Sequence, residues 1–92
     1  MSEIRLEFPT EKSSMEEVRP ILDAAIHEQF PGGMMKSRWE DDVLLLSGPG
    51  AKGSVILEDG KVVGQATLKP PASLMKPVIE KKMTQVLSKA AG

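Results

Sequence analysis

The fold is decided by the stretch SVILEDGKVVGQATLK, residues 54–69. Its centre, Asp59-Gly60, is typical of a two-residue hairpin turn, because a type I′ turn needs residues that tolerate positive φ. If Glu58 pairs with Lys61, one face carries the apolar and small side chains Val55, Leu57, Val62, Gly64, Ala66 and Leu68. The other face is mostly polar and carries Ser54, Ile56, Glu58, Lys61, Val63, Gln65, Thr67 and Lys69. This alternation predicts an antiparallel sheet with one covered face and one face in solvent.

Another hairpin is predicted immediately upstream. Residues 35–40 and 43–47 both follow a period of two, which is the period of a strand, and an acidic turn at 41–42 separates them. If this turn also has two residues, Trp39 pairs with Leu44. Both side chains would then lie on the covered face.

The N-terminal part predicts a strand followed by a helix. Apolar and charged side chains alternate over residues 4–8, and Pro9 ends the strand. Ser13-Ser14 precedes Glu16-Glu17 with the spacing of a capping box, so a helix is expected to begin there.

This first helix should end at Phe30, because Pro31-Gly32-Gly33 follows. Its packed face is predicted to carry Met15, Val18, Leu22, Ala25 and Ile26. Pro20 has no N–H to donate within the helix. We therefore expect a kink at Pro20 or a helix that starts closer to Val18.

A last helix is predicted after Pro70-Pro71, with Ser73 as its cap and Pro77 in its tolerant first turn. It should run to about Lys89. Its apolar stripe is Met75, Ile79, Met83, Val86 and Ala90, and its lysines at the flanks or behind are Lys76, Lys81, Lys82 and Lys89. The helix is therefore both basic and amphipathic.

These elements predict an α+β fold with the order β-α-β-β-β-β-α over a single domain, residues 1–92. Two amphipathic helices should pack on the apolar face of a five-stranded antiparallel sheet. Gly64 and Ala66 are small central positions on that face. They either let a helix backbone approach closely or leave a hollow, and we favour close packing.

The composition excludes several classes of function. The 92 residues include no cysteine and a single histidine, His27, so thiolate metal sites and cysteine nucleophiles are excluded, and neither a metal nor another cofactor is expected. No run of about 18 uncharged apolar residues and no secretory signal is present, so a cytoplasmic protein without a transmembrane segment is expected. Nucleic-acid binding is disfavoured, because the chain has a net charge of −1 and offers few aromatic side chains for stacking.

The charges are divided unevenly along the chain. Residues 1–46 carry five basic against ten acidic side chains, whereas residues 47–92 carry seven against three, so the halves have charges of −5 and +4. This division indicates either complementary charged regions on one surface or a basic C-terminal face that meets an anionic partner. We favour the first interpretation.

The glycine-rich segment GPGAKG, residues 48–53, has the glycine spacing of a dinucleotide fingerprint. That fingerprint needs a helix immediately after the glycines to receive a pyrophosphate, and here a strand is predicted instead. We interpret the segment as a connection between the hairpins. The remaining functional interpretation is a mobile loop that contacts an anion through Lys52 and free backbone N–H groups.

Two polar groupings are weaker candidates for chemistry. Asp23 and His27 have the spacing with which a carboxylate can orient an imidazole, but they lie on the wet helix face with no nucleophile in view. We favour a solvated pair. The acidic cluster at 40–42 lacks the spaced ligands of a calcium loop and is interpreted as a turn.

The stronger candidates are apolar. Methionines provide an adaptable surface for an apolar partner, and Met34, Met35, Met75 and Met83 are considered for it, although most are expected in the core. In the last helix, the apolar stripe with flanking lysines suits an anionic lipid or granule surface. The same pattern also suits a core helix, which we favour without excluding a helix that opens from the sheet at an interface.

A family resemblance rests on Arg38-Trp39-Glu40, on the leucine-rich strand through Leu46, on the glycines at 48, 50 and 53, and on residues 74–80. With these features in this order, the chain resembles the small polyhydroxyalkanoic acid system proteins of bacteria. The resemblance implies a cytosolic protein associated with storage polyester granules and supplies no catalytic residues. The order of elements also looks like a reduced helix-grip fold, an analogy of fold alone.

The leading hypothesis is a non-enzymatic accessory protein that binds a polyhydroxyalkanoate granule or a granule-associated protein. Its expected contact residues are Met75, Lys76, Ile79, Lys81, Lys82 and Met83. The alternative is a carrier of small acyl-type ligands with a pocket formed by Trp39, Gly64 and Ala66. An enzyme that uses His27 as its base is disfavoured. A homodimer through the outer sheet face, where Ile56 and Val63 are expected to be exposed, stays open.

Overall fold

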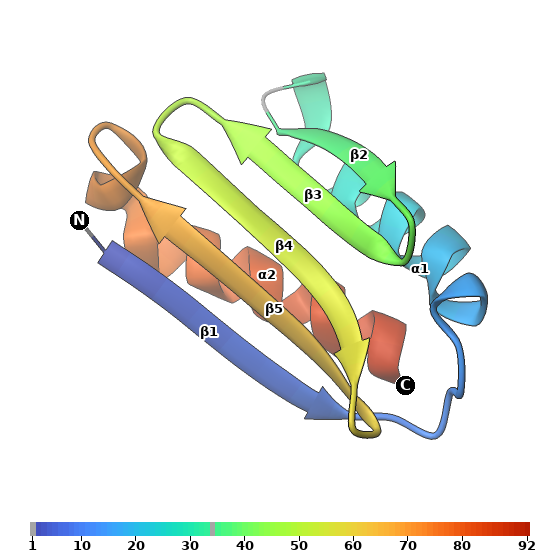
Figure 1. Ribbon diagram of the computed structural model, residues 1–92. Coiled ribbons are helices and arrows are strands. Elements are labelled where there is room, and N and C mark those ends of the chain that lie inside the picture. The colour runs from blue at the N-terminus through green and yellow to red at the C-terminus, as the bar shows by residue number, and fades with distance from the viewer. Residues whose placement is uncertain (1, 34) are drawn as a thin grey trace.

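The computed structural model describes residues 2–33 and 35–92, which form a five-stranded sheet and two α-helices (Figure 1). The elements in chain order are β1 (Ser2–Pro9), α1 (Met15–Gln29), the 3₁₀ turn η1 (Pro31–Gly33), β2 (Lys36–Glu40), β3 (Val43–Gly48), β4 (Ala51–Glu58), β5 (Lys61–Leu68), the 3₁₀ turn η2 (Ala72–Met75) and α2 (Lys76–Ala91). This α+β order is the predicted one. Met34, which was considered as a surface methionine, lies outside the described residues.

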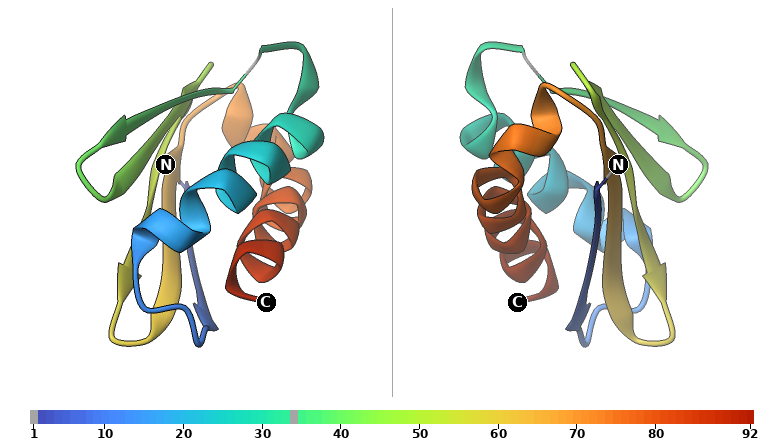
Figure 2. Two further views of the ribbon diagram at one scale, coloured as in Figure 1. Left: turned by 90° about the vertical axis from the view of Figure 1, so that its right-hand side faces the viewer. Right: turned by 90° about the vertical axis from the view of Figure 1, so that its left-hand side faces the viewer.

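The sheet has the strand order β1-β5-β4-β3-β2, and all neighbouring strands are antiparallel. Both predicted hairpin registers are confirmed, because Glu58 pairs with Lys61 and Trp39 pairs with Leu44. The first strand in the chain, β1, pairs with the last one, β5. Both helices cover the same face of the sheet, as Figure 2 shows from its two sides. The opposite face, called here the outer face, is covered by no helix of residues 2–33 and 35–92.

The core lies between the covered face and the helices. Its fully buried side chains come from both helices and from β3, β4 and β5, and the largest are Leu22, Leu44, Leu68, Leu87, Val18, Val55 and Val62. Burial of each such side chain stabilises the fold by roughly 1.5–3 kcal/mol relative to exposure. The predicted packed face of the first helix is confirmed, because all five of its residues are buried.

Close approach of α2 to the sheet occurs at Gly64. A Cβ atom at this position would lie 2.6 Å from Leu87 Cδ1, a separation that real Cβ atoms do not show. Leu87 therefore fills the space that a side chain on β5 would need. The predicted close packing is confirmed at Gly64.

Helix α1 begins at Met15 with Ser14 as its N-cap. The Glu17 carboxylate accepts hydrogen bonds from the backbone N–H groups of Ser13 at 2.9 Å and Ser14 at 3.3 Å, as the capping-box spacing predicted. These bonds, that from Ser13 first, hold the pKa of Glu17 below its ordinary value.

The expectation that α1 starts closer to Val18 is wrong, because the helix is continuous from Met15 with Pro20 inside it. Pro20 removes the hydrogen bond to the carbonyl of Glu16. Both residues are exposed, so water can satisfy that carbonyl. The end of the helix at Phe30 is as predicted.

Two other expected boundaries differ in the structure. Strand β4 begins at Ala51 rather than Ser54, so Lys52 lies in a strand and the connection to β3 is the short turn at Pro49 and Gly50. Gly50 has a φ of 73°, and a Cβ there would lie 2.5 Å from the carbonyl oxygen of Lys69. The segment is therefore a connection between strands, as interpreted from the sequence, and the alternative of a mobile loop that contacts an anion is not supported, because a short hairpin turn packs against the chain after β5.

Helix α2 begins at Lys76, and Ser73 is not its cap, because residues 72–75 form the separate 3₁₀ turn η2. Pro77 still lies in the tolerant first turn of the helix. The chain thus forms one 3₁₀ turn before α2, and the exposed side chains of Leu74 and Met75 lie in this turn.

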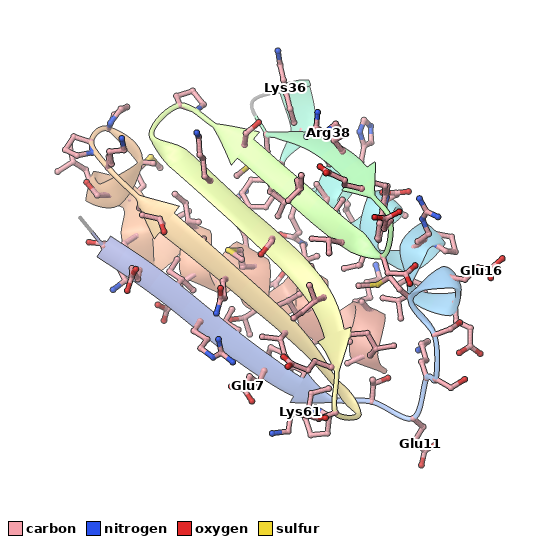
Figure 3. The ribbon with its side chains drawn as sticks, in the orientation of Figure 1. Glu7, Glu11, Glu16, Lys36, Arg38 and Lys61 are labelled. Carbon is pink, nitrogen blue, oxygen red and sulfur yellow. The ribbon has the colours of Figure 1, made fainter. Side chains whose placement is uncertain are left out.

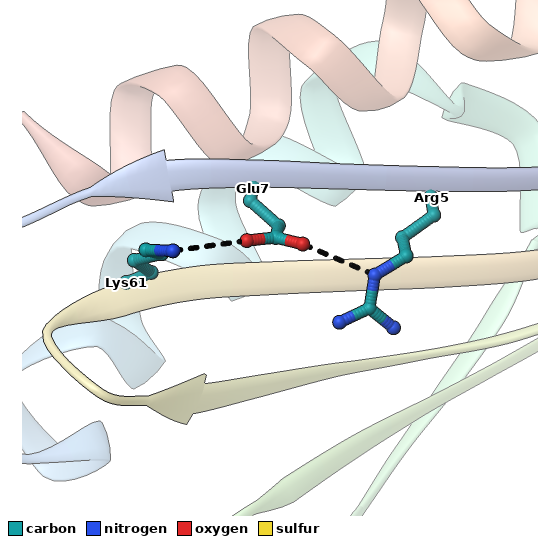
Figure 4. Close-up of polar contacts among 3 residues, drawn as sticks. All are labelled: Arg5, Glu7 and Lys61. Carbon is teal, nitrogen blue, oxygen red and sulfur yellow. Dashed lines mark hydrogen bonds and ion pairs between the residues drawn. The ribbon is translucent and has the colours of Figure 1, made fainter.

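The outer face of the sheet is more closed than its sequence predicts. Val63 was expected to be exposed but is only 4% exposed, with Glu7 and Ile56 as its neighbours on adjacent strands. On this face the Glu7 carboxylate forms ion pairs with Arg5 Nε at 3.1 Å and with Lys61 Nζ at 3.3 Å (Figure 4). These hydrogen bonds, that from Arg5 first, hold the pKa of Glu7 below its ordinary value.

Candidate functional site

Three large apolar side chains are exposed at the start of α2. Leu74 is 80% exposed, Met75 is 55% exposed and Val78 is 44% exposed. We call this group the α2 tip. Isolated exposed apolar residues are ordinary, but three within five positions form a local patch.

The local sequence explains why the tip is exposed. Farther along α2, the buried residues Met83, Val86, Leu87 and Ala90 face the sheet and α1. Val78 precedes the half-buried Ile79 by one residue, about 100° around the helix, and so points away from the core. Leu74 and Met75 lie in η2, before the helix reaches the packed layer.

Lysines accompany the tip at the same end of the molecule. Lys76 follows it directly, Lys69 lies just after β5, and Lys36 and Lys52 lie in β2 and β4 near the same end of the sheet. Glu3 and Glu80 offset part of this charge. The surrounding charge therefore favours an anionic partner.

The opposite end of the molecule is acidic. It contains the turns at 41–42 and 59–60 and the segment that precedes α1. Figure 3 shows Lys36 near the tip end and Glu11 and Glu16 near the other. Charge is thus separated between two ends of the fold, but the ends do not correspond to the two halves of the sequence, because Lys36 lies at the basic end and Asp59 at the acidic end.

Three of the six expected contact residues interact with other parts of the chain or are at least half-buried, namely Lys82, Met83 and Ile79. Lys82 Nζ donates to the backbone oxygen of Gln29 at 2.7 Å and lies 5.5 Å from the centre of the Phe30 ring. Met83 is only 4% exposed, and Ile79 is half-buried. Those that remain accessible are Met75, Lys76 and Lys81.

Sequence reasoning missed Leu74 and Val78. The signal was present, because these two residues are four positions apart and fall outside the apolar stripe of the helix. Apolar residues off the stripe cannot reach the core that the stripe reaches. They are therefore the residues to examine for a surface role.

The three residues expected to line a ligand pocket do not surround one cavity. Trp39 and Gly64 lie in one row across the sheet but are separated by Leu44 and Val55. Ala66 borders an apolar cavity of about 10 Å³, whose lining includes neither Trp39 nor Gly64. Pockets for small molecules have volumes of about 300–1,000 Å³. This cavity has room for about one water molecule.

Trp39 connects the edge strand β2 to helix α1. Its Nε1 donates to Asp23 Oδ1 at 2.9 Å, and the guanidinium carbon of Arg19 lies 4.5 Å from the ring centre. Asp23 therefore has a structural partner, which gives the Asp23–His27 spacing an explanation other than proton transfer. In residues 2–33 and 35–92, no group of three or more acidic, histidine or cysteine side chains is arranged to hold a metal ion.

Comparison with known proteins gives one match. The family model described as "Putative polyhydroxyalkanoic acid system protein (PHA_gran_rgn)" matches residues 12–90. The chain belongs to this family. No curated protein and no solved structure matches it. The family description names a cellular system and no reaction.

No helix within the described part of the chain is long and apolar enough to cross a membrane.

Proposed function

We propose that this protein is a non-enzymatic accessory protein of the polyhydroxyalkanoate system, which works in the cytoplasm and contacts the granule through the α2 tip. The observation that carries the proposal is the exposure of Leu74, Met75 and Val78 at the basic end of a chain that belongs to this family. The contact surface consists of these three side chains with Lys76 and Lys81.

The proposed contact combines two forces. Transfer of exposed apolar surface out of water is favourable by about 25 cal/mol per Å². Each lysine near an anionic surface adds about 1 kcal/mol at low salt, and this part is screened as salt rises. Binding that depends mainly on the apolar tip should therefore persist at high salt.

Co-sedimentation with isolated granules tests the apolar part of the proposal. The variant Leu74→Ser/Met75→Ser/Val78→Ser should lose granule binding by about tenfold or more, while keeping its fold because all three side chains are exposed. Circular dichroism and a urea titration check the fold. Unchanged binding by a folded triple variant would contradict the proposal.

A charge-matched pair of variants tests the role of the lysines. Lys76→Glu/Lys81→Glu should weaken binding at low salt, whereas Lys61→Glu/Lys89→Glu changes the net charge equally, away from the tip, and should have a much smaller effect. Equal loss in both variants would show that only net charge matters. Binding to protein-free polyester particles distinguishes the granule surface from a granule-associated protein as the target. If the target is a granule-associated protein, the chain should bind native granules and not the protein-free particles.

A further inference from the structure

The outer face of the sheet carries a pattern of charge that the proposed function does not use. Two neighbouring rows of outward side chains cross all five strands in the order β1-β5-β4-β3-β2. The first, called the acidic-ended row, consists of Glu7, Val63, Ile56, Val43 and Glu40. The second, called the basic-ended row, consists of Arg5, Gln65, Ser54, Leu45 and Arg38.

The two rows are complementary. The acidic-ended row has an acid at each end and apolar side chains between them, whereas the basic-ended row has an arginine at each end. They lie two residues apart along every strand, or about 7 Å. A second copy that is turned over and reversed along the strands would place each row on the other.

We propose that the outer face binds a second copy of this chain, with a twofold axis that lies between the two copies, parallel to both sheets, and runs across the strands midway between these two rows. This axis brings Glu7 over Arg5 of the second copy and Glu40 over Arg38 of the second copy. Symmetry repeats both contacts in the other direction, so the interface contains four such ion pairs.

Charges outside the two rows agree with the same axis. On β4, Glu58 comes over Lys52 of the second copy, because these residues are equally far from the axis. The turn residue Asp59 comes over Lys69 of the second copy, and the acidic turn at 41–42 comes near its Lys36. The reversal that matches the rows thus also matches the acidic end of one copy with the basic end of the other.

The other way to stack two such faces is unfavourable. A twofold axis parallel to the strands would place each row on its own copy, so Glu7 would meet Glu40 and Arg5 would meet Arg38. Like charges placed opposite each other across an interface oppose association. Charge therefore selects one of the two orientations.

The side chains available at the contact also fit. Arg5 uses only Nε toward Glu7, so both terminal nitrogens of its guanidinium are left to reach a second carboxylate (Figure 4). Arg38 donates from one terminal nitrogen to Glu40 of its own chain at 3.1 Å and keeps its other nitrogens for the contact. Between the charged ends, the half-buried Ile56 meets the smaller side chain of Ser54 from the second copy, whereas Val63 is only 4% exposed and adds little apolar area to the contact. Two sheets stacked in this way cross at about 30°, which keeps the register best at the central strand β4, so the long Glu and Arg side chains on the edge strands β1 and β2 have to span the resulting offset.

The size of the face sets the expected affinity. Five strands of five to eight residues present a surface of at most roughly 20 by 25 Å. This is smaller than the roughly 800 Å² per partner of a standard stable interface. The predicted dimer is therefore weak, with a dissociation constant in the micromolar range or above, and sensitive to salt.

Sedimentation equilibrium up to about 1 mM protein tests the dimer through charge reversal. Glu7→Arg/Glu40→Arg alone and Arg5→Glu/Arg38→Glu alone should each weaken self-association by about tenfold or more, because like charges then meet. An equimolar mixture of the two should form a heterodimer with affinity near that of the original chain. Glu11→Arg/Glu16→Arg is the matched control for Glu7→Arg/Glu40→Arg, because it raises the net charge by the same amount outside the outer face.

The orientation has its own test, which is clean because the chain has no cysteine. A short bismaleimide should link a mixture of Lys52→Cys and Glu58→Cys chains and should leave each variant unlinked when it is alone. An axis along the strands predicts the reverse, since β4 is the central strand and each residue would meet its own copy. A monomer at 1 mM, charge reversals without effect, or links within the single variants would each overturn the proposal. None of these substitutions is at a tip residue, so the dimer can be disproved without affecting the proposal for granule binding, and the reverse also holds.

Discussion

The two ends of helix α2 differ in what they contact. At its C-terminal end, Leu87 is only 1% exposed and presses against Gly64, and Lys89 pairs with Glu28 of α1 at 3.2 Å. At its N-terminal end, Val78 is exposed, and so is Leu74 in η2 just before the helix. The same basic amphipathic sequence thus packs in the core over most of its length and leaves its N-terminal tip exposed. Amphipathic character alone does not distinguish these roles, because packing decides which apolar residues remain exposed.

The largest predicted effect is on the free energy of unfolding, when leucine is replaced by alanine at each end of this helical segment. Leu87→Ala should lower the free energy of unfolding by about 2–5 kcal/mol, because it leaves a cavity in the core. Leu74→Ala should change it by less than about 0.5 kcal/mol. Urea unfolding of both variants measures the difference. Equal losses would mean that the tip is part of the core.

A smaller effect concerns the contact beneath Leu87. Gly64→Ala should destabilise the fold by about 1–3 kcal/mol, because its Cβ would meet Leu87 Cδ1 at 2.6 Å. In the Leu87→Ala background the same change should cost much less, since the obstructing atoms are gone. A double-mutant cycle measures this coupling. Additive losses would show that Gly64 and Leu87 do not determine how closely α2 approaches the sheet.

The smallest effect lies at the start of α1, the other helix. The pKa of Glu17 is lowered in the folded state, so its contribution to stability is present above its ordinary pKa of 4.5 and is lost as the pH falls through the folded value. The difference in unfolding free energy between the original chain and Glu17→Gln should therefore shrink between pH 6 and about pH 3. Glu16→Gln is the control. A difference that is constant with pH would show that the cap does not depend on the charge.

The sequence predicted most of the fold because its strongest signals are local. Asp59-Gly60 specified a hairpin, and the period of two specified which side chains on β4 and β5 face the core. The position of β1 beside β5 could not be predicted in this way, because residues far apart in the chain make that pairing. The start of β4 was placed too late, because a glycine-rich segment resembles a loop even where Gly53 pairs with Leu46.

The candidate site was predicted only in part. The helix and the accessible residues Met75, Lys76 and Lys81 came from the amphipathic pattern. That pattern could not reveal that Lys82 donates to Gln29, because this contact depends on how α1 and α2 meet. Nor could it reveal the tip as a unit, because η2 interrupts the helix at the position where the sequence still suggests helical continuity.

The most direct test of the central claim is a polarity-sensitive fluorophore attached to Leu74→Cys, with Glu11→Cys at the opposite end as the control. The chain has no other cysteine, so each variant carries one label. When granules are added, the dye at position 74 should shift to the blue and become shielded from aqueous quenchers, whereas the dye at position 11 should not change. A bound protein whose label at position 74 remains in water would contradict the claim that the α2 tip makes the contact.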